Sequence, residues 1–357
     1  MIKRILCTLL LGMLSAQVTS MAGLHDNTPG IFALTHVTIV QKPGTFIEDG
    51  TIVIRDGVIT AAGKKVTIPE DAFVMDLSGK TVYAGFIESY WKKENKKPSI
   101  FNFGDEKKKE QKRPVIDHWS KKVHPEASVL DAFHPNDKEL EELRKLGFTT
   151  AQVVPAKGIF RGRSSIVHLG DWGADAVITE NGPAQFMAFE HGSWGDPGYP
   201  GSLMGTISLM RQTFYDANWY ADAWQFYNRN KDKTEAPQVD RALGTLAEEL
   251  NGTRQFCFET KHELMALRVN KLANEFNLNV WLKGSGYEYR RLSEIEELNT
   301  FVILPLDYPK IPDVDSWEDA LDFSLEQLRH WDQAPDNAAR MVEAGISFAL
   351  TSNDLKN

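Results

Sequence analysis

The sequence has few cysteines and no long apolar segment. Only two of its 357 residues are cysteine, Cys7 and Cys257, which argues against both a framework of disulfides and a cysteine-based metal site. After the first twenty residues, no apolar stretch is long enough to cross a bilayer, so we expect no membrane anchor. Stability must then come from a hydrophobic core, and a chain of this length can bury one.

The sequence also lacks a surplus of positive charge. Asp and Glu number 49 against 40 Lys and Arg, which gives a formal net charge of −9. This balance argues against nucleic acid and against anionic lipid as partners. Hydrophobic residues make up 42% of the chain, as in ordinary globular proteins.

The N-terminus has the three-part layout of a secretory signal peptide. Lys3 and Arg4 precede an apolar run over residues 5–14, and small residues follow it. The run is too short to span a membrane as a stable anchor. We therefore predict that residues 1–22 are a signal peptide and that the protein is exported, either periplasmic or secreted.

Residues 31–87 have a β pattern. Two apolar runs flank the pair Asp56-Gly57, which is a strong signal for a two-residue hairpin turn. Further short β-patterned runs follow, so we predict a small, mostly antiparallel sheet. We assign residues 23–84 to an N-terminal β-sandwich segment.

A lysine-rich stretch follows over residues 92–125, with little periodic apolar content. Such a charge run is typical of a solvated loop rather than of a binding patch. We interpret residues from about 92 to 135 as a charged loop inserted into a second domain, residues 85–357.

From residue 136 onward, helix and strand patterns alternate. Repeated strand–helix units of this length predict a parallel sheet with helices outside it, as an open sheet or a closed barrel. Capping boxes are predicted to open three of the helices. They are formed by Asn136 with Glu139, Thr260 with Glu263, and Ser293 with Glu296. Strands are predicted over 149–154, 255–258, 279–282, 301–304 and 347–350.

Several motifs resemble the amidohydrolase superfamily. The junction Gly85-Phe86-Ile87-Glu88 is similar to the family's Gly-Phe-Ile-Asp-x-His-x-His, where a small β-sandwich passes into a (β/α)₈ barrel. The run Gly147-Phe148-Thr149-Thr150 and the ending 343–350 are similar to later conserved stretches. Exported imidazolonepropionase-like amidohydrolases share this pattern. The resemblance implies an α/β fold, a TIM-type (β/α)₈ barrel, complete or C-terminally incomplete, with a small N-terminal β-sandwich domain.

The metal ligands that the resemblance implies are not found. Tyr90 and Lys92 stand at the His-x-His positions, Lys283 at the fifth-strand His, and no His follows the sixth strand. Asn353 replaces the eighth-strand Asp, and Asp354 would reach its place only by a register shift that turns the side chain away. Phenol and ammonium are poor metal ligands, and an amide cannot take a proton from water. We expect no metal and no cofactor, and the catalytic residues are unknown.

Other polar groups have two interpretations each. Glu259 and Lys283 lie at neighbouring strand ends, where we expect them to form an ion pair in the place of the metal. Glu190 with His191 forms an acid–base pair or has a structural role. The three histidines of the polar region bind zinc or lie on the surface. They are His118, His124 and His134.

Two further features remain open. An aromatic group at helical spacing forms core or stacks on a ligand. It consists of Phe214, Tyr215, Trp219, Tyr220, Trp224, Phe226 and Tyr227. The segment Arg161-Gly162-Arg163-Ser164-Ser165 is predicted to be a short, flexible basic loop that could hold an anion.

Three functions follow from this sequence. The first is a non-catalytic amidohydrolase-like subunit or ligand-binding domain. Its partner would be an active homologue or a chain that completes the β-sandwich. The second is an active metal-dependent hydrolase of carbon–nitrogen, non-peptide bonds. The third is an exported protein that binds peptides or glycans.

Overall fold

The computed structural model describes most of the chain in two compact units that divide between Ala84 and Gly85. The described residues are 30–93, 118–133, 137–170, 177–179, 182–191, 198–252, 254–316, 318–353 and 355. The predicted signal peptide lies outside them, and so does the larger part of the predicted charged loop. Each unit is described by itself.

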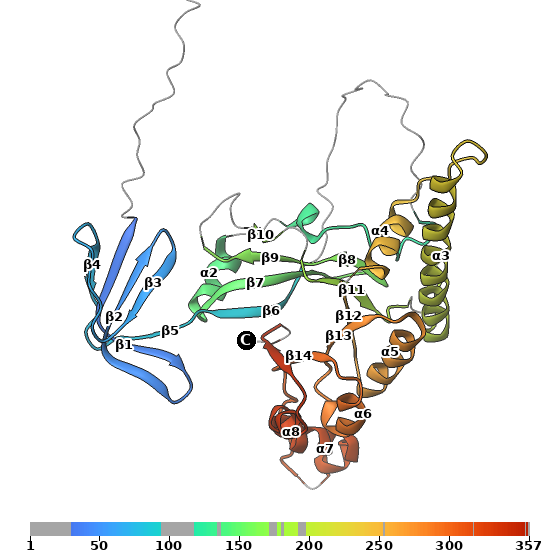
Figure 1. The fold of residues 1–357 in the computed structure, drawn as a ribbon. Helices are drawn as coiled ribbons and strands as arrows, with labels where there is room; N and C mark the ends of the chain where they lie inside the picture. Colours follow the sequence, from blue (N-terminus) through green and yellow to red (C-terminus); the bar gives the residue numbers. More distant parts are fainter. Residues whose placement is uncertain are drawn as a thin grey trace, which may run out of the picture. The chain divides into compact units, whose positions relative to one another are not determined.

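The first unit is one five-stranded sheet (Figure 1). Its strands are β1 (Ile31–Lys42), β2 (Thr45–Arg55), β3 (Val58–Gly63), β4 (Phe73–Asp76) and β5 (Thr81–Tyr83). The hairpin prediction is confirmed, because Asp56 and Gly57 both have positive φ, as a type I′ turn requires. β4 and β5 pair parallel with β1, so the sheet is mixed rather than mostly antiparallel.

The second unit contains two sheets. The first has the order β10-β9-β7-β6 and the second the order β15-β14-β13-β12-β11-β8. The first is built from β6 (Phe86–Lys93), β7 (Phe148–Pro155), β9 (Ser165–His168) and β10 (Val177–Thr179). The second is built from β8 (Phe160–Arg163), β11 (Ala184–Ala188), β12 (Gln255–Glu259), β13 (Asn279–Lys283), β14 (Phe301–Pro305) and β15 (Phe348–Thr351).

Strands β11 to β15 run parallel, and β6 runs parallel to β7. The predicted parallel sheet is therefore confirmed. The described strands form a mixed α/β structure with two separate sheets in this unit, and not one continuous eight-stranded ring.

The helices of the second unit fall mostly between these strands. They are α2 (Asp137–Lys145), α3 (Leu203–Arg229), α4 (Arg241–Leu250), α5 (Glu263–Phe276), α6 (Leu292–Glu296), α7 (Leu325–Gln333) and α8 (Asn337–Glu343). Within the described parts of the chain, none of the helices has the length and apolarity needed to cross a membrane.

Alternation along β12 separates two cores. Phe256 and Phe258 pack into a large cluster with helix residues such as Phe214. Cys257 points the other way, into a smaller cluster with Tyr90. Successive strand residues face opposite sides of a sheet, so Glu259 shares the face of Cys257 and Tyr90.

Glu88 connects the first and last strands of the second unit. This carboxylate is 1% exposed. Its oxygens accept hydrogen bonds from the Tyr90 backbone N–H at 2.9 Å, from the Thr351 hydroxyl, and from the N–H and hydroxyl of Ser352 at 2.9 and 2.5 Å. The Ser89 hydroxyl also donates to the Leu350 carbonyl at 2.8 Å. Side-chain bonds thus hold β6 beside β15, although no backbone ladder joins these two strands in the described structure.

Two of the predicted capping boxes are wrong. The Thr260 hydroxyl donates instead to the carbonyl of Lys283 at 2.8 Å, and α5 begins after His262, which makes no side-chain cap bond. The helix near Ser293 begins after Arg291, again without a side-chain cap. The box at Asn136 lies outside the described residues.

The predicted flexible loop over residues 161–165 is also wrong. Arg161 and Gly162 belong to β8, and Ser165 opens β9. Gly162 has φ of +103°, and a Cβ there would lie 2.4 Å from the Ala127 carbonyl oxygen. Only glycine fits this close approach, which allows β8 to pass beside residue 127.

We predict that Glu88→Gln lowers the free energy of unfolding by about 2–3 kcal/mol, because one buried backbone N–H, of Tyr90 or Ser352, loses its acceptor. Urea denaturation of the variant and the parent measures this. Glu297→Gln, an exposed glutamate, is the matched control and should change stability by under about 0.5 kcal/mol. Equal effects of the two substitutions would contradict the role given to Glu88.

Candidate functional site

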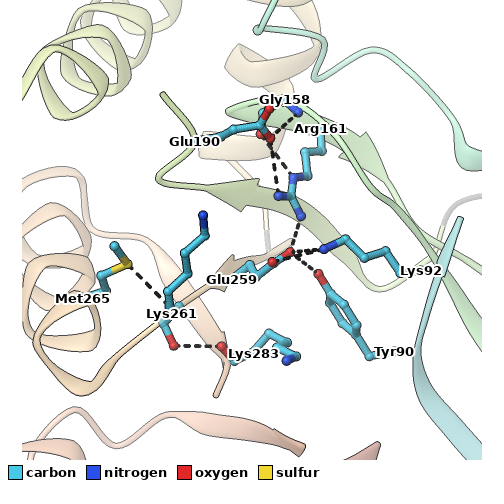
Figure 2. A network of polar contacts seen from close by, with 10 residues as sticks. Tyr90, Lys92, Gly158, Arg161, Glu190, Glu259, Lys261, Met265 and Lys283 are labelled. Atoms are coloured by element: carbon cyan, nitrogen blue, oxygen red, sulfur yellow. Dashed lines mark hydrogen bonds and ion pairs between the residues drawn. The ribbon is translucent and has the colours of Figure 1, made fainter. Parts of the chain in front are cut away.

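A largely buried glutamate at the carboxyl end of β12, Glu259, binds polar side chains from two other strands, β6 and β8; its own side chain is 15% exposed. Figure 2 shows Tyr90, Lys92 and Arg161 converging on Glu259. The Tyr90 hydroxyl donates to Glu259 Oε2 at 2.7 Å. The Lys92 ammonium lies 3.1 and 3.2 Å from the two carboxylate oxygens, and Arg161 Nη1 donates to Oε2. We call Tyr90, Lys92, Arg161 and Glu259 the Glu259 network.

Arg161 joins this network to a second carboxylate. Its side chain is 5% exposed, and its Nη2 lies 3.6 Å from Glu190 Oε2. Its Nε donates to the Gly158 carbonyl at 3.1 Å, while the Gly158 N–H donates to Glu190 at 2.9 Å. The Arg161 guanidinium therefore lies between the carboxylates of Glu190 and Glu259, and the Gly158 carbonyl, three residues earlier in the chain, helps to orient it.

The charged groups of the network stabilise one another in their ionised forms. Burial alone would raise the pKa of Glu259, but Arg161, Lys92 and the Tyr90 hydroxyl lower it to about 2. Burial would lower the pKa of Arg161, yet the negative charge of Glu259 raises it overall. Burial and the same negative charge raise the pKa of Tyr90 well above its ordinary range. At neutral pH the network therefore holds a charged carboxylate and a neutral phenol.

Lys283 has a different contact from the one predicted. Glu259 and Lys283 do lie opposite each other on β12 and β13. The cations that bind the carboxylate, however, are Lys92 and Arg161, and the Lys283 ammonium lies 5.7 Å from the centre of the Tyr90 ring. This distance is within the range of a cation–π contact.

A cavity of about 240 Å³ opens beside the network. The polar side chains of its wall are those of Lys92, Arg161, Glu190, Glu259 and Lys261. It lies where β12 ends, and the carboxyl ends of parallel strands are where α/β proteins bind ligands.

The donor set of this site does not fit a divalent cation. The two positions that would carry His-x-His hold a neutral phenol and an ammonium, and a second cation, Arg161, already neutralises Glu259. A metal ion bound to the Glu259 carboxylate would meet the positive charges of Lys92 and Arg161 within a few ångströms, and Arg161 also pairs with Glu190. Among the residues that the structure describes, no group of three or more His, Cys, Asp and Glu side chains could hold a metal.

The described histidines of the polar region make local contacts. His118 accepts from the Ser120 N–H at 3.1 Å, and His124 lies 2.9 Å from the Lys121 carbonyl. His134 lies outside the described residues. Glu190 pairs with Arg161 rather than with its neighbour His191.

The position that the resemblance gives to the eighth-strand acid carries an amide. Asn353 stands where the resemblance places an Asp, and its amide nitrogen is buried without a hydrogen-bond partner in the described part of the chain. Asp354 lies outside the described residues.

The aromatic group on α3 divides between the two faces of the helix. Phe214 and Tyr220 are buried, while Tyr215, Trp219 and Phe226 are more than half exposed. The core interpretation therefore holds for the inward members only.

A larger cavity, of about 400 Å³, lies near the start of β12. It is lined by Glu249, whose two carboxylate oxygens have no hydrogen-bond partner among the described residues, although the Arg254 Nε lies 3.2 Å from one of them. Burial raises the pKa of Glu249 to about 7, and Arg254 offsets only part of this effect. The amino-terminal side of parallel strands serves stability more often than catalysis, so we take the Glu259 network as the functional site.

Comparison with known proteins gives a fold and no family by sequence. No family model and no curated protein matches the chain. The structure is similar to that of an amidohydrolase from Thermotoga maritima, with a TM-score of 0.66 and 18% identity over 90% of this chain and 79% of that one. At this identity, the similarity shows a shared amidohydrolase-like fold and nothing finer.

Two other solved structures are more distant. A second amidohydrolase has a TM-score of 0.44 and 12% identity over 92% of this chain and 79% of its own. The guanine deaminase of E. coli has a TM-score of 0.37 and 11% identity over 90% of this chain and 74% of its own. Scores at this level carry no argument.

The sequence brought Tyr90, Lys92 and Glu259 near one another, but the flexible basic loop predicted for residues 161–165 did not link Arg161 to Glu259. A signal for this link is the apolar pair Ile159-Phe160 directly before Arg161, which is compatible with a short buried strand.

We predict that Glu259→Gln destabilises the protein in a pH-dependent manner. The pKa of Glu259 is about 2 in the folded state and ordinarily 4.5. The charged form therefore stabilises the fold above about pH 4.5, and this stability is lost as the pH falls toward 2. The difference corresponds to about 3 kcal/mol.

Urea denaturation near pH 7 and near pH 3 measures the effect, which should be smaller at the lower pH. Glu275→Gln is the matched control, because Glu275 pairs with Arg211 at the surface, where an ion pair contributes at most about 1 kcal/mol. A loss that is equally large at both pH values would count against the charge of Glu259 as its cause.

For Glu249 the dependence of stability on pH has the opposite sign. Its pKa is about 7 in the folded state against an ordinary 4.5, so the folded state loses stability as the pH rises through this interval. We predict that Glu249→Gln is more stable than the parent at about pH 8, by about 2–3 kcal/mol, and similar to it near pH 5. Thermal or urea unfolding checks this, with the exposed Glu297→Gln as control. A variant less stable at pH 8 would show that the Arg254 pair outweighs burial.

Proposed function

We propose that this protein is an exported, amidohydrolase-fold ligand-binding domain or subunit in which the Glu259 network has replaced the metal site. The finer form of the fold that we propose is an N-terminal β-sandwich segment joined to an incomplete TIM-type barrel of the imidazolonepropionase-like kind. The similarity to the Thermotoga maritima amidohydrolase supports the fold. The observation that carries the function is the binding of Glu259 by Lys92 and Arg161.

Hydrolysis by the metal route needs a water bound to a cation and a base that accepts its proton. Glu259 is a poor base, because the pKa of this carboxyl is about 2. Lys92 and Arg161 are cationic, and the Tyr90 phenol keeps its proton. The side chains around the cavity can instead hold a ligand by charge and hydrogen bonds.

A protein partner is a second part of the proposal. Large apolar side chains are exposed on the sheet of the first unit, among them Val58, Ile59, Phe73, Val74 and Tyr83. Exposed apolar residues grouped on one sheet are typical of a surface that another chain covers. An active homologue, or a chain that supplies further strands, would fit such a surface.

The alternative is a metal-dependent hydrolase of carbon–nitrogen, non-peptide bonds, which the amidohydrolase-like fold favours. The two functions differ in metal content, so that one measurement separates them.

We predict that the purified protein, saturated with zinc and then dialysed, retains well under one zinc ion per chain by mass spectrometric metal analysis. His124→Ala serves as control for adventitious surface binding. About one ion per chain that survives this substitution, with a Kd near micromolar or tighter, would overturn the proposal in favour of the hydrolase.

A further inference from the structure

The cavity beside Glu259 has more positive than negative charge on its wall. Three cationic side chains line it, those of Lys92, Arg161 and Lys261, against the two carboxylates of Glu190 and Glu259.

The two carboxylates are already compensated. Arg161 contacts both Glu190 and Glu259, and Lys92 contacts Glu259 as well. The ammonium of Lys261 has no ion pair with any residue that the structure describes, although it lines the same cavity (Figure 2). Lys261 is an exposed residue of this wall, and its charge is not balanced by an ion pair within the described structure.

The neighbouring helix adds to this excess. Lys261 directly precedes α5, a helix of 14 residues whose N-cap, His262, makes no side-chain cap bond. The first N–H groups of such a helix carry a partial positive charge. Thr260, which was predicted to cap the helix, lies two residues before its N-cap position, and its hydroxyl donates to the Lys283 carbonyl.

We propose that this cavity binds a small oxyanion, a carboxylate or a phosphate, whose charge pairs with the Lys261 ammonium. The proposal rests on the ligand-binding function proposed above and names the class of ligand. Lys92 and Arg161 neutralise Glu259 and Glu190 so that these carboxylates do not repel the anion, and Arg161 acts as a positioning residue. A volume of about 240 Å³ is below the usual range for drug-sized ligands, so the ligand is small.

Titration calorimetry at low ionic strength tests the site with three probes, namely succinate, inorganic phosphate and succinamide, the neutral analogue of succinate. We expect saturable binding of at least one of the two anions, weakened at high salt, and no binding of succinamide. Lys261→Met should weaken binding about tenfold or more. The matched control is Lys271→Met, an exposed lysine on α5, which should leave the affinity unchanged.

Lys92→Met is the second variant, because it exposes the charge of Glu259 to the cavity and should also weaken binding. Binding of succinate alone assigns a carboxylate ligand, and binding of phosphate alone assigns a phosphate. If neither anion binds, if succinamide binds equally well, or if both lysine variants bind like the parent, the oxyanion site is overturned.

Zinc analysis of the same preparation separates the two proposals. A zinc-free protein that binds no anion overturns the oxyanion site alone. A protein that retains zinc overturns the proposed function, whatever the anions do.

Discussion

The burial of the Glu259 charge is the constraint on which the site depends. A carboxylate at the inner end of a strand costs several kcal/mol unless cations and hydrogen-bond donors replace its water. Here the donors come from β6 and β8, which lie far from β12 in the sequence and are not its sheet neighbours, but whose side chains reach Glu259. One negative charge thus binds the side chains of Tyr90, Lys92 and Arg161.

Tyr90 and Lys92 stand at positions suited to two metal ligands, but their side chains are poor ligands. Tyr90 and Lys92 are two residues apart on one strand, so both side chains face the same side, as a His-x-His pair would. A phenol and an ammonium placed in this way donate hydrogen bonds, whereas two imidazoles would donate electron pairs. The two positions thus carry hydrogen-bond donors where the resemblance places metal ligands. Glu259, an acceptor, receives a bond from each of them.

The sequence predicted the parts of the fold that depend on local patterns. The Asp56-Gly57 hairpin follows from the turn that these two residues favour, and the strands from β12 to β15 follow from apolar runs between helical patterns. The convergence of Tyr90 and Lys92 followed from their spacing of two. The partners of Glu259 could not be obtained in this way.

Two residues show why. Arg161 lies in a segment rich in glycine and polar residues, which has the local pattern of a loop; it becomes a strand because Gly162 fits against residue 127 and β11 pairs beside it. The Thr260 hydroxyl could cap α5 or bond a carbonyl of β13. The local sequence allows both interactions. The tertiary structure determines which one forms, and in this fold the hydroxyl donates to the carbonyl of Lys283.

The carboxylate of Glu88 has a consequence for the order in which the second unit acquires its structure. Its bonds to Thr351 and Ser352 span 263 and 264 residues of sequence. A ribosome releases the chain from its N-terminus, so β6 emerges long before its neighbour β15 has been synthesised. During that interval, water must satisfy Glu88, and the edge of β6 stays open to other strands. Contacts of such long range also slow folding, so β6 is open to incorrect strand pairing until β15 has been synthesised.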